Sequence, residues 1–126
     1  MKENLIRDKS YRFALRIIKT CRLLKSQHEY EIASQLLRSG TSIGANTEEA
    51  IGGQSRKDFY QKINIAHKES RETHYWLRLI KDFEILDAKI ADSLIKDCEE
   101  LVKLSASIIK TMKATPNPSS KNETVK

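Results

Sequence analysis

The segment spanning residues 38–50 constrains the fold of this chain more than any other, and it reads RSGTSIGANTEEA. The periodicity on either side predicts a helix, yet a glycine inside a helix costs about 1 kcal/mol relative to alanine, and this segment contains Gly40 and Gly44. Its serines and threonines also compete for backbone hydrogen bonds. Because the two glycines are four residues apart, they share one face, where another backbone can approach closely. A helix of this composition therefore needs tight tertiary packing; the alternative is a loop, since clusters of Gly and Ser commonly mark loops.

Elsewhere the chain is poor in residues that break helices. Its 126 residues include four glycines and two prolines, and both prolines lie in the last twelve residues. A hydrophobic content of 39% is enough for a core, although 32% of the residues are charged. We therefore expect one all-α domain over residues 1–114, followed by a disordered tail over residues 115–126.

Apolar residues recurring every three or four positions predict four helices, near residues 4–26, 30–51, 55–84 and 87–113. Ser55 and Asp87 are suitable N-caps, and Gly52-Gly53 is expected to end the second helix in the left-handed conformation. The fourth helix repeats every seven residues, with Leu94, Leu101 and Ile108 on one side and Lys89, Lys96, Lys103 and Lys110 on the other. Short connections favour an antiparallel up-down four-helix bundle.

The first helix is expected to contribute an apolar stripe that includes Tyr11, Ile17, Ile18 and Leu24. This stripe and that of the fourth helix are wider than a lone bundle needs. We therefore expect the bundle to be oligomeric.

The positive charge of the chain is concentrated in the first helix. The net charge is +6, and residues 1–28 alone carry eight Lys or Arg against two Asp or Glu. Five of these cations recur at helical spacing, namely Lys9, Arg12, Arg16, Lys19 and Arg22. This row is the candidate nucleic-acid-binding site, because each cation can neutralise a phosphate; the alternative is a solvated face without a ligand. We expect no exposed aromatic residues between the cations, and hence no reading of bases.

A second set of polar residues is expected to form a structural layer between the second and third helices. It consists of Arg38, Ser42, Asn46, Glu69 and Glu72. In this interpretation Arg38 forms a buried ion pair with Glu69 or Glu72, which fixes the register of the two helices. A di-metal site is the alternative, but the Glu-x-x-His motif that helical bundles use for it does not occur. We therefore predict no metal and no cofactor.

The remaining sequence features argue against several other classes of protein. No phosphate-binding loop follows a strand, and no Ser/His/Asp or Cys/His set is evident, so we expect no enzyme. Cys21 and Cys98 stand on apolar faces and are interpreted as buried free thiols, with a single disulfide as the alternative. No run of about 18 apolar residues and no N-terminal signal sequence occurs, which indicates a cytoplasmic protein that does not enter a membrane.

Several motifs together resemble a known family. They are residues 38–50, the segment SRKDF at 55–59, Ile65-Ala66, Glu69-Ser70, Glu72-Thr73 and Tyr75-Trp76-Leu77, with YRFA at 11–14. They are similar to the four-helix bundle proteins related to those encoded in intervening sequences of bacterial 23S ribosomal RNA. The resemblance covers about residues 5–112, and Thr47 departs mildly from it, where isoleucine is more usual.

This resemblance implies a homopentamer of four-helix protomers. It also implies kinship with the accessory proteins of diversity-generating retroelements, which bind a reverse transcriptase and nucleic acid. No catalytic residue can be carried over, because the family has no established catalytic motif.

Two functional hypotheses follow. The first is a non-catalytic oligomer that binds RNA or DNA through phosphate contacts on the first helix. The second is an adaptor or assembly module whose partner is another protein. A steep dependence of nucleic-acid affinity on salt concentration would favour the first.

Overall fold

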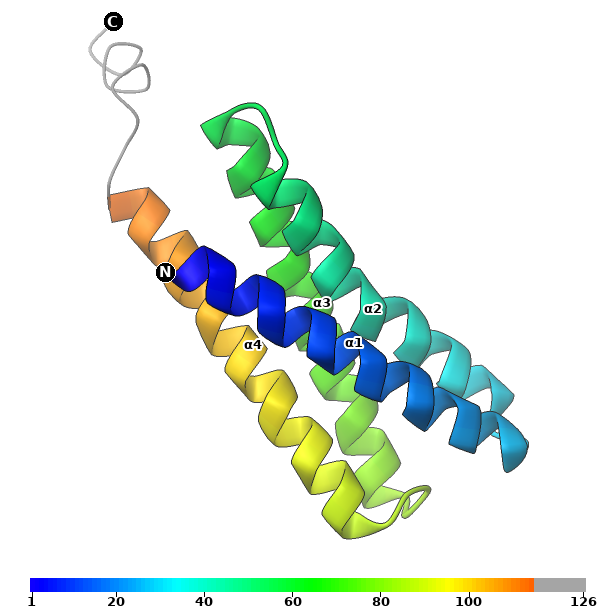
Figure 1. Cartoon of the computed structure of the whole chain (residues 1–126). Helices are drawn as coiled ribbons and strands as arrows, with labels where there is room; N and C mark the ends of the chain where they lie inside the picture. Colours follow the sequence, from blue (N-terminus) through cyan, green and yellow to red (C-terminus); the bar gives the residue numbers. More distant parts are fainter. Residues whose placement is uncertain (115–126) are drawn as a thin grey trace, which may run out of the picture.

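The computed structural model describes residues 1–114, which form four α-helices and contain no strand (Figure 1). The helices are α1 (Lys2–Ser26), α2 (Tyr30–Ile51), α3 (Arg56–Asp82) and α4 (Ala88–Ala114). The all-α prediction is confirmed, and each helix end lies within about two residues of its expected position, which is the usual uncertainty of helix boundaries. The predicted tail at 115–126 lies outside the described residues.

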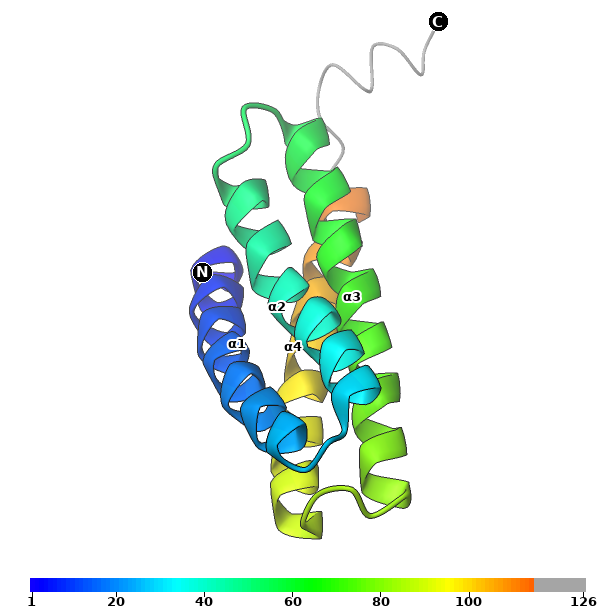
Figure 2. The ribbon, with the colours of Figure 1, turned by 90° about the vertical axis from the view of Figure 1, so that its right-hand side faces the viewer.

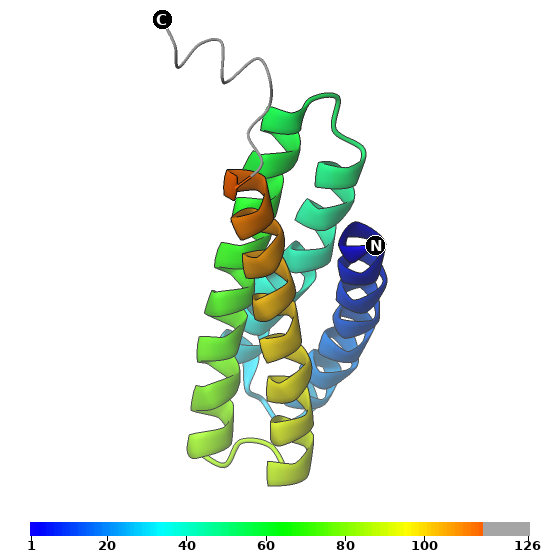
Figure 3. The same cartoon turned by 90° about the vertical axis from the view of Figure 1, so that its left-hand side faces the viewer.

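The four helices surround one core and are joined by short connections (Figure 2). The chain reverses its direction at each connection, so that consecutive helices pack side by side (Figure 2). Helices α1 and α3 lie on opposite sides of the bundle, with α2 between them in one view and α4 between them in the opposite view (Figures 2 and 3). The outer surfaces of α1 and α3 therefore face different directions. Within residues 1–114, no helix is both long and apolar enough to cross a membrane.

The core is formed by large aliphatic side chains from all four helices. Its fully buried members include Ile17, Leu24, Leu36, Ile43, Ile63, Leu77, Ile80, Leu94 and Leu101. Burying one such side chain stabilises the fold by about 1.5–3 kcal/mol. The seven-residue pattern of α4 is confirmed, because Leu94, Leu101 and Ile108 are buried while the lysines of the opposite face are exposed.

Two of the three connections contain a non-glycine residue in the left-handed conformation, at the second position after the helix. His28 has φ 65° and Glu84 has φ 58°. At the end of α1, the N–H of His28 donates to the Lys25 carbonyl and the N–H of Glu29 donates to the Leu24 carbonyl. Glu84 and Ile85 repeat these two bonds at the end of α3. This is the Schellman arrangement, in which the last carbonyls of a helix find donors beyond its end.

The expectation for the end of α2 was wrong. Gly52 has φ −81°, and no glycine of the described chain has a positive φ. Close packing provides a reason for glycine at the next position instead: a Cβ on Gly53 would lie 3.1 Å from the Ala50 carbonyl oxygen and 3.3 Å from the Asp58 Cβ. The predicted caps of the following helices are present, since Ser55 Oγ accepts from the Asp58 N–H at 3.0 Å and Asp87 Oδ1 accepts from the Lys89 N–H at 2.8 Å.

Residues 38–50 are helical within α2, so the loop alternative is excluded. Both glycines are buried against α1. A Cβ on Gly40 would lie 2.9 Å from two carbons of the Ile17 side chain, whereas a Cβ on Gly44 would meet the Ser10 backbone oxygen at 3.4 Å. The predicted close helix–helix contact is thus confirmed, and its partner is α1.

The predicted apolar stripe of α1 is partly wrong. Ile17 and Leu24 are buried as expected, but Tyr11 is 61% exposed and Ile18 is 39% exposed. The reason is that the buried face of α1 also contains polar residues, Ser10 among them, which fit where α2 approaches closely. Because these small polar residues face α2, Tyr11 and Ile18 lie outside the buried face of α1.

The two glycines of α2 are expected to respond differently to alanine. Gly44→Ala should raise thermal stability or leave it unchanged, because its Cβ meets ordinary contacts and alanine gains about 1 kcal/mol of helix propensity. Gly40→Ala should lower thermal stability, because the buried Ile17 side chain must move, which costs about 1–3 kcal/mol. Urea unfolding of both variants tests this difference.

Gly44→Leu should destabilise the protein by about 1–3 kcal/mol, and a variant that unfolds like the parent would contradict the close contact.

Candidate nucleic-acid interface

The basic row of α1 is divided by the structure into two parts. Lys9 Nζ lies 2.9 Å from Glu100 Oε1 of α4, and Arg16 forms an ion pair with Asp97 of the same helix. Both pairs are part-exposed, so each contributes at most about 1 kcal/mol to stability. Their effect on the surface is larger, because they neutralise two carboxylates that would otherwise repel an anionic ligand.

The other cations of the row point away from the bundle. Arg12, Lys19 and Arg22 are exposed, and within residues 1–114 none of the three forms a side-chain hydrogen bond or an ion pair. No Asp or Glu occurs between residues 9 and 28. This stretch of α1 therefore presents uncompensated positive charge over several helical turns.

Exposed apolar side chains accompany these cations. Tyr11, Leu15 and Ile18 are spaced by four and three residues and form one strip along the outer side of α1. The expectation that no exposed aromatic residue lies among the cations was wrong, because Tyr11 stands between Lys9 and Arg12. The same rotation of α1 that buries Ser10 brings this strip to the surface.

The polar layer between α2 and α3 is only partly as predicted. Arg38 forms ion pairs with both Glu69, at 3.2 Å, and Glu72, which also accepts a hydrogen bond from Trp76 Nε1 at 3.0 Å. The Arg38 side chain is 49% exposed, however, so this is not a buried pair. Its contribution to stability is at most about 1 kcal/mol, rather than the roughly 3–5 kcal/mol that breaking a buried pair costs.

Ser42 and Asn46 do not join that layer in the interactions that the structure shows. Asn46 Nδ2 donates to the Ser42 carbonyl of its own helix at 2.9 Å. A buried polar contact between α2 and α3 is instead made by two residues that the sequence analysis did not assign to this layer: the hydroxyls of Ser39 and Thr73 lie 2.9 Å apart and are fully buried. Ser39 precedes Gly40 on the inward side of α2, and the position of Ser39 in the helical period could have indicated its burial.

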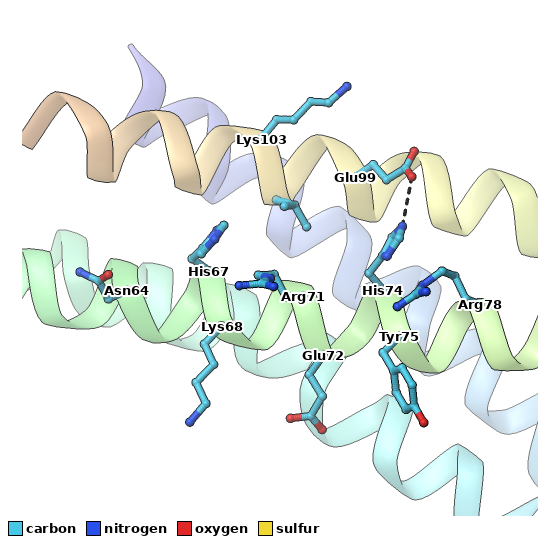
Figure 4. A pocket seen from close by; sticks show the side chains of 11 residues that line it. Asn64, His67, Lys68, Arg71, Glu72, His74, Tyr75, Arg78, Glu99 and Lys103 are labelled. Atoms are coloured by element: carbon cyan, nitrogen blue, oxygen red, sulfur yellow. Dashed lines mark hydrogen bonds and ion pairs between the residues drawn. The ribbon is translucent and has the colours of Figure 1, made fainter.

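A groove between α3 and α4 was also missed by the sequence analysis (Figure 4). It has a volume of about 950 Å³ and is open to solvent. Basic residues and histidines from both helices line it, namely His67, Lys68, Arg71, His74, Arg78 and Lys103. The seven-residue spacing of His67 and His74, and of Arg71 and Arg78, was the signal in the sequence, but only the pairing of the two helices shows that these residues share one groove.

His67 is held in the wall of this groove. Its Nδ1 lies 2.9 Å from Ser105 Oγ, and the Ser105 hydroxyl donates to the Leu101 carbonyl at 2.8 Å. We infer that the Ser105 oxygen accepts from Nδ1–H of His67, because the single hydroxyl hydrogen of Ser105 is used toward the Leu101 carbonyl. Burial, followed by the positive charge of Arg71, lowers the pKa of His67 below its ordinary value of 6.5.

The two cysteines are buried free thiols, as predicted. Burial raises the pKa of Cys21 to about 11 and that of Cys98 to about 12. The thiols lie 3.3 Å from the carbonyl oxygens of Ala33 and Ser70. Such thiols are poor nucleophiles, because the reactive thiolate is disfavoured. Across residues 1–114, no group of three or more His, Cys, Asp or Glu is arranged to hold a metal ion.

The fold and its surfaces define a small four-helix protein with basic faces on the outside of α1 and between α3 and α4. Comparison with known families then identifies its membership: the profile of the 23S rRNA-intervening sequence proteins matches residues 2–107, and the chain belongs to this family. No curated protein sequence is significantly similar to it.

A solved structure supports the same assignment. The chain is 48% identical to a protein of unknown function from the S23 ribosomal protein family of Bacteroides thetaiotaomicron VPI-5482. The match covers 87% of this chain and 99% of that one, with a TM-score of 0.83. The family resemblance inferred from the motifs is thus confirmed. Neither name carries an enzymatic activity.

His67 should make the stability of the protein sensitive to acid. The ordinary pKa of a histidine is 6.5. As the pH falls below this value, the unfolded chain binds a proton at this residue more readily than the folded protein does, so the free energy of unfolding decreases. Above this pH, the contribution of His67 to the free energy of unfolding is constant. The variant His67→Asn does not titrate and can keep a donor near Ser105. Urea unfolding at about pH 7.5 and about pH 5.5 should show a smaller acid-dependent loss for this variant than for the parent. Equal losses would contradict the lowered pKa.

Proposed function

We propose that this protein is a non-catalytic, homo-oligomeric antiparallel four-helix bundle that binds RNA through phosphate contacts on the outer face of α1. The observation that carries the proposal is the division of the basic row. Lys9 and Arg16 neutralise carboxylates of α4, and Arg12, Lys19 and Arg22 are left without an ion-pair partner within residues 1–114. A row of uncompensated cations on a rigid helix attracts a polyanion. The family is named for an intervening sequence of 23S rRNA, which directs the proposal to RNA.

The oligomer part of the proposal rests on the exposed apolar strip of α1. Tyr11, Leu15 and Ile18 expose large apolar side chains on one side of a helix. A second copy that covers this strip removes that area from water. The family resemblance implies a closed homopentamer. In such a ring the cations beside the strip are repeated around the symmetry axis, so that weak phosphate contacts add up by multivalency.

Charge on the apolar strip should dissociate the oligomer. The double variant Leu15→Glu with Ile18→Glu should be monomeric at concentrations of tens of micromolar, an order-of-magnitude range for weak association, and should keep its helical content. Sedimentation equilibrium measures the mass of both proteins. The matched control is Leu79→Glu with Ile90→Glu, which changes two other exposed apolar residues, on α3 and in α4, and should leave the oligomer intact. A parent protein that sediments as a monomer refutes the proposed assembly.

Reversing the charge of unpaired cations should weaken RNA binding. Arg12→Glu with Lys19→Glu should lower the affinity for an RNA hairpin and flatten its salt dependence, by about 0.9 in the slope of log K against log salt for each phosphate that is no longer neutralised. Fluorescence anisotropy between about 50 mM and about 200 mM salt measures both effects. The control Lys89→Glu with Lys110→Glu makes the same change of charge on the exposed face of α4 and should bind like the parent.

The adaptor hypothesis remains as the second candidate because the strip formed by Tyr11, Leu15 and Ile18 is also suited to a protein partner. If the parent protein binds no RNA at low salt, or if the double variant at Arg12 and Lys19 binds as tightly as the parent, phosphate binding by α1 is refuted. The adaptor interpretation would then take its place.

A further inference from the structure

The groove between α3 and α4 carries positive charge that the structure does not compensate. Its two acidic side chains have partners of their own: Glu99 Oε2 lies 3.1 Å from His74 Nε2, a pair that is ionic only when the histidine is protonated, and Glu72 is paired with Arg38. In the described part of the chain, Arg71 and Arg78 form no ion pair. The four Lys and Arg side chains of the lining, Lys68, Arg71, Arg78 and Lys103, outnumber its two carboxylates, so the groove has an excess of positive charge (Figure 4).

An aromatic ring stands beside these arginines. Tyr75 is 47% exposed and lies among the groove-lining residues. Its ring is braced by Trp76, with centroids 5.1 Å apart and planes at 66°, and the guanidinium carbon of Arg78 lies 5.8 Å from its centroid. An exposed ring held in a fixed orientation next to arginine is the combination on which unpaired bases stack.

The shape of the groove restricts the ligand further. Packed helices have axes about 8–10 Å apart, so a groove between them does not admit a nucleic-acid duplex. A duplex also keeps the faces of its bases stacked on one another, away from Tyr75. Along α3 the lining extends from Asn64 to Arg78, about 21 Å at the rise of an α-helix. That length accommodates about four to six nucleotides of an extended strand.

We propose that the α3–α4 groove is a binding site for single-stranded nucleic acid, in which Arg71, Arg78, Lys68 and Lys103 hold phosphates and Tyr75 stacks on a base. The site is separate from the proposed α1 face, because α1 and α3 lie on opposite sides of the bundle (Figures 2 and 3). His67 is neutral and contributes a polar wall rather than charge. The groove thus selects unpaired strands, whereas the α1 row is suited to the phosphates of a folded RNA.

The single tryptophan of the chain reports on this site, since Trp76 contacts Tyr75. Titration with an unstructured RNA dodecamer should quench its fluorescence, and anisotropy of a labelled strand should give the affinity. Tyr75→Ala should weaken binding by about 5- to 150-fold, the range expected for the loss of one stacked base. Tyr75→Phe keeps the ring and should bind within about twofold of the parent. Arg71→Glu with Arg78→Glu should weaken binding further and flatten its salt dependence. An equivalent DNA strand tests whether the sugar matters.

The outcomes that would refute the two proposed sites are different. If the groove variants lose binding to the dodecamer but bind a blunt RNA hairpin normally, and Arg12→Glu with Lys19→Glu shows the opposite pattern, both sites are supported. If the dodecamer does not bind at low salt, or binds equally well to Tyr75→Ala and to the double arginine variant, the groove proposal is overturned while the α1 proposal stands. All of these residues are exposed, so circular dichroism should show an unchanged fold.

Discussion

The close approach of α1 and α2 is the contact on which the rest of the surface depends. Gly40 removes the Cβ that would collide with Ile17, and Gly44 lets the backbone of α1 at Ser10 come within van der Waals distance of α2. Two glycines within a helix cost about 2 kcal/mol of helix propensity. That cost is offset by the packing of α1 against α2, since the residues that line the contact are buried.

This contact also fixes the rotation of α1 about its own axis. With Ser10 and Ile17 turned inward, Lys9 and Arg16 are directed to α4, where Glu100 and Asp97 meet them. The same rotation turns Arg12, Lys19 and the strip of Tyr11, Leu15 and Ile18 to solvent. A packing requirement deep between two helices therefore decides which cations are neutralised and which remain available to a ligand.

The sequence was sufficient to predict the helices and the inward side of α4, because a seven-residue repeat of Leu94, Leu101 and Ile108 admits one orientation. It was not sufficient for α1. There the buried face includes the polar residues Ser10 and Thr20. A prediction from apolar periodicity alone therefore places the buried face too close to Tyr11 and Ile18. The left-handed residues were also not predicted. His28 and Glu84 adopt positive φ because the chain leaves each helix in a Schellman turn. Histidine and glutamate are not residue types that indicate such a turn.

The candidate sites were predicted to different degrees for the same physical reason. A row on one helix, such as that of Lys9 to Arg22, can be found from spacing alone, but whether its members are paired depends on the neighbouring helix. The groove needs two helices from the start, since Arg71 and Lys103 share it only after α3 and α4 have packed. Within residues 1–114, Arg71 and Arg78 form no ion pair, because Glu72 is paired with Arg38 and Glu99 lies against His74. Ion pairs of modest energy thus act on the surface mainly by withdrawing negative charge from both basic faces, a role that their contribution to stability does not measure.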